Sequence, residues 1–195
     1  MAAAAGCDEL GLNFVAGRAR AIDVTLARAI RDAVSLPLVG IVADADDALL
    51  ESLQGVGLDA LQLHGSESPA RCAELLARGL RVYKAVPVRS ANDVDGAGQY
   101  PGERVLFDAP RGGSGVAFDW SWLAAAGLRP YLLAGGLTPD NVATAIARSH
   151  AAGVDVASGV EAMGEGDKDP AKLAAFVEKA REAFAARISR GTQLC

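Results

Sequence analysis

The sequence predicts an α/β fold of the (β/α)8 TIM-type barrel class, with seven recognisable strands. Short apolar runs alternate with amphipathic stretches along the chain, and Gly or Asp follows most of the apolar runs. One such run, Val105–Phe107, ends in Asp108, which is how barrel enzymes present an acid at the end of a buried strand. We therefore expect one barrel domain over residues 1–195, with 189–195 as a frayed tail.

The strands are predicted where apolar runs are bounded by Gly, Pro or Asp. They are Glu9–Phe14, Pro37–Val42, Ala60–Leu63, Arg81–Val86, Arg104–Phe107, Tyr131–Ala134 and Val154–Ala157. A closed barrel needs one more strand, and the deficit lies at the beginning. Alanines up to Ala5 indicate the last turn of a helix that Gly6 stops, so we expect the chain to start within a repeat unit, with the first strand missing.

Caps and apolar faces predict the intervening helices. Asp23 is expected to cap a helix that buries Leu26, Ile30 and Val34, and Asp44 to cap the next one. That next helix is expected to turn Leu49, Leu50, Leu53 and Val56 inward. The next helix is expected to start at Ser68 and Pro69 and to stop at Gly79, and Ala91–Gln99 gives only a weak helix signal. Helices are also expected over Trp120–Ala126 and Pro170–Ile188. Between these two, Thr138 and Pro139 are expected to cap a helix that turns Val142, Ala145 and Ile146 inward.

Composition limits the classes of partner. A net charge of −5 without a run of Lys or Arg argues against nucleic acid and anionic membranes, and favours a small molecule. Three distant cysteines and two histidines indicate neither a disulfide framework nor a metal site. Apolar runs stay below the roughly 18 residues of a membrane span, and Met1–Ala5 lacks the basic start of a signal peptide, so we expect a cytoplasmic protein.

Glycines after the last two strands predict a phosphate site. Gly135 and Gly136 end one strand, and Ser158 and Gly159 end the next, where barrel loops commonly hold phosphate with backbone N–H groups. The alternative is that these residues only make tight turns. The loop from Gly112 to Gly115 is interpreted as a segment that closes over substrate, with a flexible linker as the alternative.

The strand ends GLNF, QLHG, LFDAPRGGSG, LAGGLTPDNV and VASGVE follow one another in an order that resembles the phosphoribosylanthranilate isomerase family. The resemblance runs from Ala4 to about Ala186. It implies an Amadori rearrangement in tryptophan biosynthesis, from an aminoaldose to an aminoketose, on a ribose phosphate linked to anthranilate. No cofactor is implied, and a monomer or homodimer is expected. Another phosphate-binding barrel of the same pathway, an indoleglycerol-phosphate lyase, is the less favoured alternative, because LFDAPRGGSG is typical of the isomerase.

The resemblance also implies roles for individual residues. Asp108 is similar to the family's general acid, with a loop acid or helix cap as the alternative reading. Arg20 is similar to the arginine that meets the anthranilate carboxylate, although an ordinary surface arginine is the other possibility. Gln62 and His64 are expected to line the pocket, unless His64 is only a satisfied structural histidine. Gly113 and Gly115 are expected to contact substrate from the glycine-rich loop.

The family's general base is a cysteine in a KICG-type motif that this sequence does not contain. Cys7 precedes the strand Glu9–Phe14, on the side of a barrel that serves stability, so it is not expected to replace the base. Cys72 shares a helix face with Leu75 and is expected to be buried, and Cys195 belongs to the tail. The sequence therefore leaves two hypotheses: an active isomerase, or an inactive phosphate-binding barrel that lacks its base.

Overall fold

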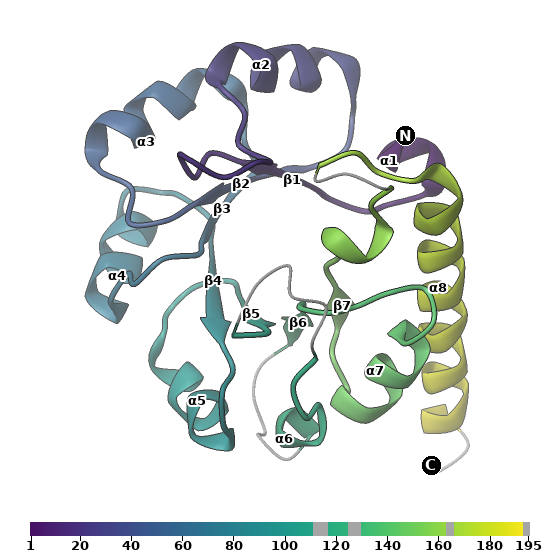
Figure 1. The fold of residues 1–195 in the computed structure, drawn as a ribbon. Coiled ribbons are helices and arrows are strands. Elements are labelled where there is room, and N and C mark those ends of the chain that lie inside the picture. Colours follow the sequence, from purple (N-terminus) through teal and green to yellow (C-terminus); the bar gives the residue numbers. More distant parts are fainter. Residues whose placement is uncertain (111–116, 125–129, 163–165, 193–195) are drawn as a thin grey trace. The chain divides into compact units, whose positions relative to one another are not determined.

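The computed structural model describes residues 1–110, 117–124, 130–162 and 166–192, side chains being described up to residue 189. Within these residues the strands belong to one sheet whose order follows the chain from β1 to β7 (Figure 1). They are β1 Leu10–Asn13, β2 Leu38–Val42, β3 Ala60–Leu63, β4 Val82–Pro87, β5 Arg104–Asp108, β6 Tyr131–Leu133 and β7 Gly153–Val154. The pairs β1–β2, β2–β3, β3–β4 and β6–β7 are parallel. The predicted alternation of strand and helix is confirmed.

The chain groups into two compact units. The first, here called the N-terminal unit, holds Ala2–Ala85 and Gln99–Val105, and the second, the C-terminal unit, holds Val86–Gly98 and Leu106–Cys195. The helices of the N-terminal unit are α1 Ala2–Ala5, α2 Val24–Ala33, α3 Asp47–Leu53, the 3-10 turn η1 Gln54–Val56 and α4 Pro69–Ala77. Those of the C-terminal unit are α5 Ala91–Gly96, α6 Ser121–Ala124, α7 Val142–Ser149, the 3-10 turn η3 Ser158–Val160 and α8 Pro170–Thr192. A further 3-10 turn, η2, covers Ala97–Gln99.

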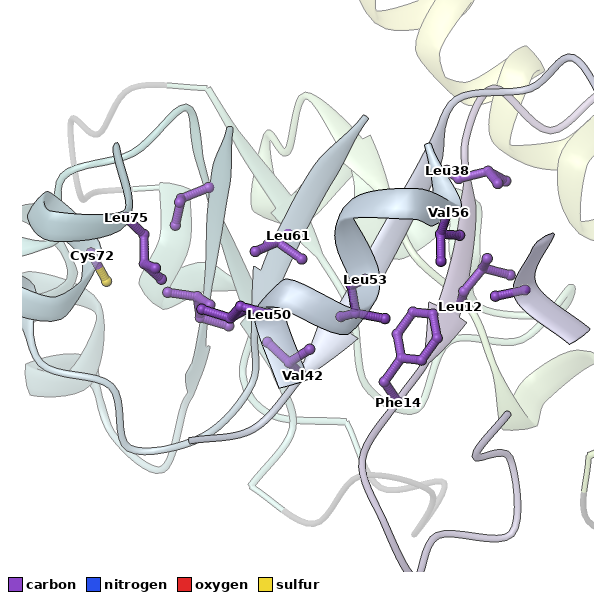
Figure 2. Close-up of a cluster of buried hydrophobic side chains, with 13 residues drawn as sticks. Leu12, Phe14, Leu38, Val42, Leu50, Leu53, Val56, Leu61, Cys72 and Leu75 are labelled. Atoms are coloured by element: carbon purple, nitrogen blue, oxygen red, sulfur yellow. The ribbon is translucent and has the colours of Figure 1, made fainter. Parts of the chain in front are cut away.

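The core of the N-terminal unit lies between β1–β4 and the helices α2 to α4 (Figure 2). Its strand residues alternate along each strand, and all are at least nine-tenths buried; they include Leu12, Leu38, Val42, Leu61, Leu63 and Val82. The opposite face of the sheet carries a smaller cluster, Val39, Ala60 and Tyr83. Because side chains alternate between faces, Gln62 lies on the same face as Ala60, and away from the helices. The strand period thus separates the helix-facing core from the face that carries Gln62.

Two of the predicted details of α2 and α3 are wrong. Leu26 is 50% exposed, whereas Ala27 is fully buried, because α2 is turned so that its inner face runs from Ala27 through Ile30 to Val34. Asp46, not Asp44, caps α3, and its carboxylate accepts a hydrogen bond from Leu49 N at 2.8 Å. Asp44 instead uses its carboxylate to accept from Ser66 N. The caps at Asp23 and Ser68 are confirmed by hydrogen bonds from backbone N–H groups in the first turn of each helix.

In the C-terminal unit, α7 and α8 pack side by side (Figure 1). The predicted inward residues Val142, Ala145 and Ile146 are fully buried. The cap of α7 is Asn141 rather than Thr138, because the Thr138 carbonyl already accepts from Asn141 N and Val142 N in a preceding turn. The last strand, β7, is shorter than predicted, and α8 continues past its predicted end to Thr192.

Candidate active site

Asp108 lies at the carboxyl end of β5, as the sequence predicts, and is half-buried. The end of this strand is held on both sides: Val88 N donates to the Asp108 carbonyl at 2.9 Å, and Ala134 N donates to the Phe107 carbonyl at 2.7 Å. The carboxylate faces the loop after β6. A Cβ atom placed on Gly135 would lie only 2.6 Å from Asp108 Oδ1. The structure therefore brings the predicted acid and one of the predicted phosphate-binding glycines into contact.

The loops after β6 and β7 lie against each other. A Cβ atom on Gly159 would lie 1.8 Å from the Leu137 carbonyl oxygen, so only glycine permits this approach. Gly136 is fixed by Asn141, whose Nδ2 donates to the Gly136 carbonyl and whose Oδ1 accepts from Thr138 N, both at 2.8 Å. Ser158 and Gly159 start the turn η3, and the first N–H groups of such a turn are natural donors to an anion. The four predicted phosphate residues thus form two adjoining loops.

Two lysines donate hydrogen bonds to the backbone at the ends of the turn η3. Lys168 Nζ donates to the Ala157 carbonyl at 2.7 Å and pairs with Glu161 Oε1 at 3.0 Å. Lys172 Nζ donates to the Glu161 carbonyl at 2.8 Å. Ala157 and Glu161 flank the turn, so these contacts fix both of its ends. Sequence reasoning missed this support because the lysines lie between the last predicted strand and the last predicted helix, where no functional motif was identified.

Gln62 and His64 come together at the carboxyl end of β3. Gln62 is 6% exposed, and its Nε2 lies 3.0 Å from His64 Nδ1. His64 follows the strand and is exposed. Arg20 lies in another loop, between β1 and α2, where Ala21 bridges to Asn13, and it is half-buried. The three polar residues predicted for this unit therefore all follow or end strands, and two of them are in direct contact.

A buried ion pair, Lys84 with Glu67, lies next to the backbone on both sides of His64, and the sequence analysis did not predict it. Lys84 Nζ lies 3.1 Å from Glu67 Oε2, and each side chain is 4% exposed. Lys84 lies inside the predicted strand Arg81–Val86, where the sequence analysis assigned it no role. The useful signal is the alternation: Lys84 is two residues from Val82 and so must face the helices.

The remaining predicted residues are placed as follows. Asp155 falls within the predicted last strand, Val154–Ala157, but in the structure it follows β7 and is exposed. Cys7 lies before β1, and Cys72 is fully buried on α4, where burial raises the pKa of its thiol. Gly112, Gly113, Gly115 and Cys195 lie outside the described residues. Among the residues that the structure describes, no group of three or more His, Cys, Asp and Glu could hold a metal ion, and no helix is long and apolar enough to cross a membrane.

A sheet with an acid at a strand's carboxyl end and glycine loops after its last two strands is typical of an α/β barrel-type protein. The family model described as N-(5'-phosphoribosyl)anthranilate (PRA) isomerase matches residues 1–179. The chain belongs to this family.

Named relatives agree with the family assignment. The chain is 45% identical to the N-(5'-phosphoribosyl)anthranilate isomerase of Ruegeria sp. strain TM1040, over 92% of this chain and 90% of that protein. It is also 45% identical to the enzyme of the same name from Rhodospirillum rubrum, over 91% and 89%. The crystal structure of phosphoribosyl anthranilate isomerase from Thermotoga maritima matches with a TM-score of 0.84 and 32% identity, covering 93% of this chain and 91% of that one. The barrel fold expected from the sequence is therefore shown.

A second solved structure bears on the site. It is phosphoribosyl anthranilate isomerase in complex with reduced 1-(o-carboxyphenylamino)-1-deoxyribulose 5-phosphate, and it matches with a TM-score of 0.81 and 30% identity over 93% of this chain and 91% of that one. That relative binds a compound with a phosphate and an aromatic carboxylate.

Proposed function

We propose that this chain catalyses the Amadori rearrangement of N-(5-phosphoribosyl)anthranilate to the corresponding 1-deoxyribulose phosphate, a step of tryptophan biosynthesis. The observation that carries the proposal is the contact between Asp108 and Gly135, because it puts a proton donor beside the loops suited to phosphate. A substrate anchored by its phosphate then presents its ribose to the acid. The relatives that bear this activity in their names support the same reaction.

In this proposal Asp108 acts as the general acid. It gives its proton to the ribose ring oxygen as the bond from that oxygen to C1 breaks, which opens the ring to a protonated Schiff base. Removal of the proton from C2 then moves the electron pair toward the Schiff base nitrogen and forms an enolamine. Transfer of the enol proton to C1 gives the aminoketose, so the reaction is an isomerisation and needs no redox cofactor.

The other candidate residues anchor the two ends of the substrate. Gly135, Gly136, Ser158 and Gly159 are proposed to bind the phosphate through backbone N–H groups. Arg20 is proposed to meet the anthranilate carboxylate, because a guanidinium fork suits a planar anion. Gln62 and His64 are proposed to contact the substrate. Each such contact would restrict the motion of the bound substrate and so lower the entropic cost of the reaction.

The test is an isomerase assay on the full chain with the aminoaldose substrate. Asp108→Asn keeps the size of the side chain but removes the transferable proton, so turnover should fall by about 100-fold or more. Asp140→Asn is the matched control, because Asp140 is 95% exposed and its nearest charged partner is Lys179 at 3.6 Å. Equal turnover in Asp108→Asn and wild type would remove Asp108 from the mechanism.

A second candidate function is phosphate-ligand binding without turnover. It is favoured by the places of Cys7 before β1 and Cys72 inside α4, since neither thiol lies at the carboxyl end of a strand. Under this alternative the chain binds a product analogue in calorimetry but shows no isomerase activity. Binding together with measurable turnover would instead show that another group serves as base.

We also propose that the partner is a phosphorylated small molecule, without nucleic acid, and that the protein works in the cytoplasm as a monomer or homodimer. The net charge of −5 supports the first point. One similar structure, from Thermotoga maritima, is described as monomers generated from a dimeric isomerase, so both states occur in that relative. Light scattering on the full chain distinguishes them here.

A further inference from the structure

The buried pair of Lys84 and Glu67 lies directly behind the strand end that carries His64. Lys84 faces the helix side of β4, in register with Leu63 on β3, and Cys72 on α4 is near enough for both charges to affect its thiol. A lysine and a glutamate are rarely buried to this degree unless they are paired and hydrogen-bonded. The role of the pair can therefore be inferred from the groups to which it is hydrogen-bonded.

Lys84 donates to the backbone on both sides of His64. Its Nζ lies 3.2 Å from the Leu63 carbonyl oxygen and 2.8 Å from that of Gly65, and it also reaches the Ala85 carbonyl at 2.9 Å. Together with Glu67, four acceptors surround one compact ammonium group. The backbone of His64 is thus held at the residue before it and at the residue after it.

Glu67 holds the same loop from its other side. Its Oε2 accepts from Gly65 N at 3.0 Å, and its Oε1 accepts from Asp44 N at 2.8 Å. Asp44 has a φ of 49°, a conformation that is unfavourable for a residue with a side chain, so it needs such support. Asp44 Oδ1 accepts in turn from Ser66 N at 2.8 Å. The ion pair therefore ties together the loops that follow β2 and β3.

We propose that Lys84 and Glu67 are positioning residues, which fix the backbone of His64 so that Gln62 holds its imidazole in one tautomer and one direction. Gln62 is buried on β3, so its amide is stationary, whereas His64 lies in the following loop. The amide N–H of Gln62 can donate to Nδ1 only when the imidazole carries its proton on Nε2. A small shift of the loop would lengthen this 3.0 Å contact.

A merely stabilising role explains the pair less well. Burying two charges is costly, and a well-packed apolar pair of the same volume is often as stable or more stable. The hydrogen bonds of the pair are directed to backbone groups of four residues, Asp44, Leu63, Gly65 and Ala85, which an apolar pair cannot reproduce. The role of His64 in substrate contact rests on the proposed function, but its fixed tautomer does not.

The experiment compares Lys84→Met/Glu67→Met with wild type by nitrogen-15 NMR of the imidazoles at about pH 8.5, where an ordinary histidine is neutral. The chain has two histidines, so His150 on α7's end serves as an internal reference. We expect the His64 nitrogens to change from one tautomer to a mixture, with His150 unchanged. The control is Arg81→Met/Glu103→Met, which removes an exposed pair joined at 2.6 Å before β4 and β5.

Retention of the wild-type His64 signals in the Lys84→Met/Glu67→Met protein would overturn the proposal, as would an equal change in the control. If the double variant does not fold, Glu67→Gln replaces it, with Glu103→Gln as its control. Gln keeps an acceptor for Asp44 N but turns an amide N–H toward Lys84, so His64 should still lose its single tautomer. Unchanged signals in Glu67→Gln would overturn the proposal in the same way.

Kinetics then test whether positioning serves the reaction. In the proposed isomerase, loss of the pair should lower kcat/KM about 10-fold, and it should have no further effect when His64 is already Ala. An equal further loss in the His64→Ala background would refute positioning through His64. If the chain shows no isomerase activity, the proposed function fails, while the NMR result still decides the role of the pair.

Discussion

Gly135 is the most informative single position in the candidate site. It has a φ of 82°, where a side chain is unfavourable, and a Cβ atom there would lie 2.2 Å from Ala109 N and 2.5 Å from Ala109 Cβ. Ala109 N is backbone directly after Asp108, so rotation of a side chain cannot relieve the contact. Gly135→Ala must therefore move either the loop after β6 or the end of β5.

The size of the effect follows from these distances. The contact must open from 2.2 Å to at least 3.4 Å, where van der Waals contacts are ordinary, so the displacement is on the order of 1 Å. A displacement of that size at a catalytic group costs about 100-fold in rate. The left-handed backbone adds about 1–2 kcal/mol and the overpacking about 1–3 kcal/mol, so the free energy of unfolding should fall by roughly 2–5 kcal/mol.

Gly79→Ala separates the two contributions. Gly79 has a φ of 83°, almost the same as that of Gly135, but a Cβ atom there meets nothing within 4 Å. We expect Gly79→Ala to lose only the backbone contribution of about 1–2 kcal/mol in urea unfolding and to keep its full isomerase rate. If Gly135→Ala and Gly79→Ala had the same rate and the same stability, the close approach of Gly135 to Ala109 would have no effect on Asp108.

The remaining predictions use other parts of the C-terminal unit. Gly159→Ala should push the loops after β6 and β7 apart and weaken a phosphorylated product analogue about 10-fold or more in titration calorimetry, while the dephosphorylated analogue is unaffected; equal losses would mean that the loops do not bind phosphate. Lys168→Met should weaken the same analogue less, because Lys168 holds the turn η3 without entering it, and an unchanged affinity would contradict that support. Burial raises the pKa of Tyr131, whose hydroxyl donates to the Ser149 carbonyl, so the unfolded chain loses this proton first. Stability should therefore be complete below about pH 10 and decline above it toward the folded pKa, and urea unfolding should show a shallower alkaline decline in Tyr131→Phe.

The strands and the residues at their ends could be predicted because their signals are local. Apolar runs bounded by Gly or Asp located the strand from Ala60 to Leu63 at its observed bounds, and the strand ending at Asp108 to within one residue. Gly135 and Asp108 were each predicted at a strand end, and parallel strands bring such ends to one edge of a sheet. Their direct contact still required the structure, because it depends on the missing Cβ atom.

The helix details failed where two interpretations fitted the same residues. Asp44 and Asp46 are both good caps, and the competition was decided by Ser66, a residue from another loop that engages the carboxylate of Asp44. Thr138 and Asn141 posed the same problem, and an extra turn before α7 placed the cap at Asn141. Local propensity cannot rank such pairs, because both residues of each pair are good caps and the choice depends on the hydrogen bonds that the folded backbone makes.

The pair of Lys84 and Glu67 shows why the support of a site is harder to predict than its residues. Each charge is separated from its partner by 17 positions, and neither carries a motif of its own. In the structure, Lys84 donates to the carbonyl oxygens of Leu63 and Gly65, the residues on both sides of His64. Lys168 does the same for the turn that starts at Ser158. In both units a lysine donates hydrogen bonds to the backbone next to a candidate substrate contact, so each candidate residue is held by a side chain from a distant part of the sequence.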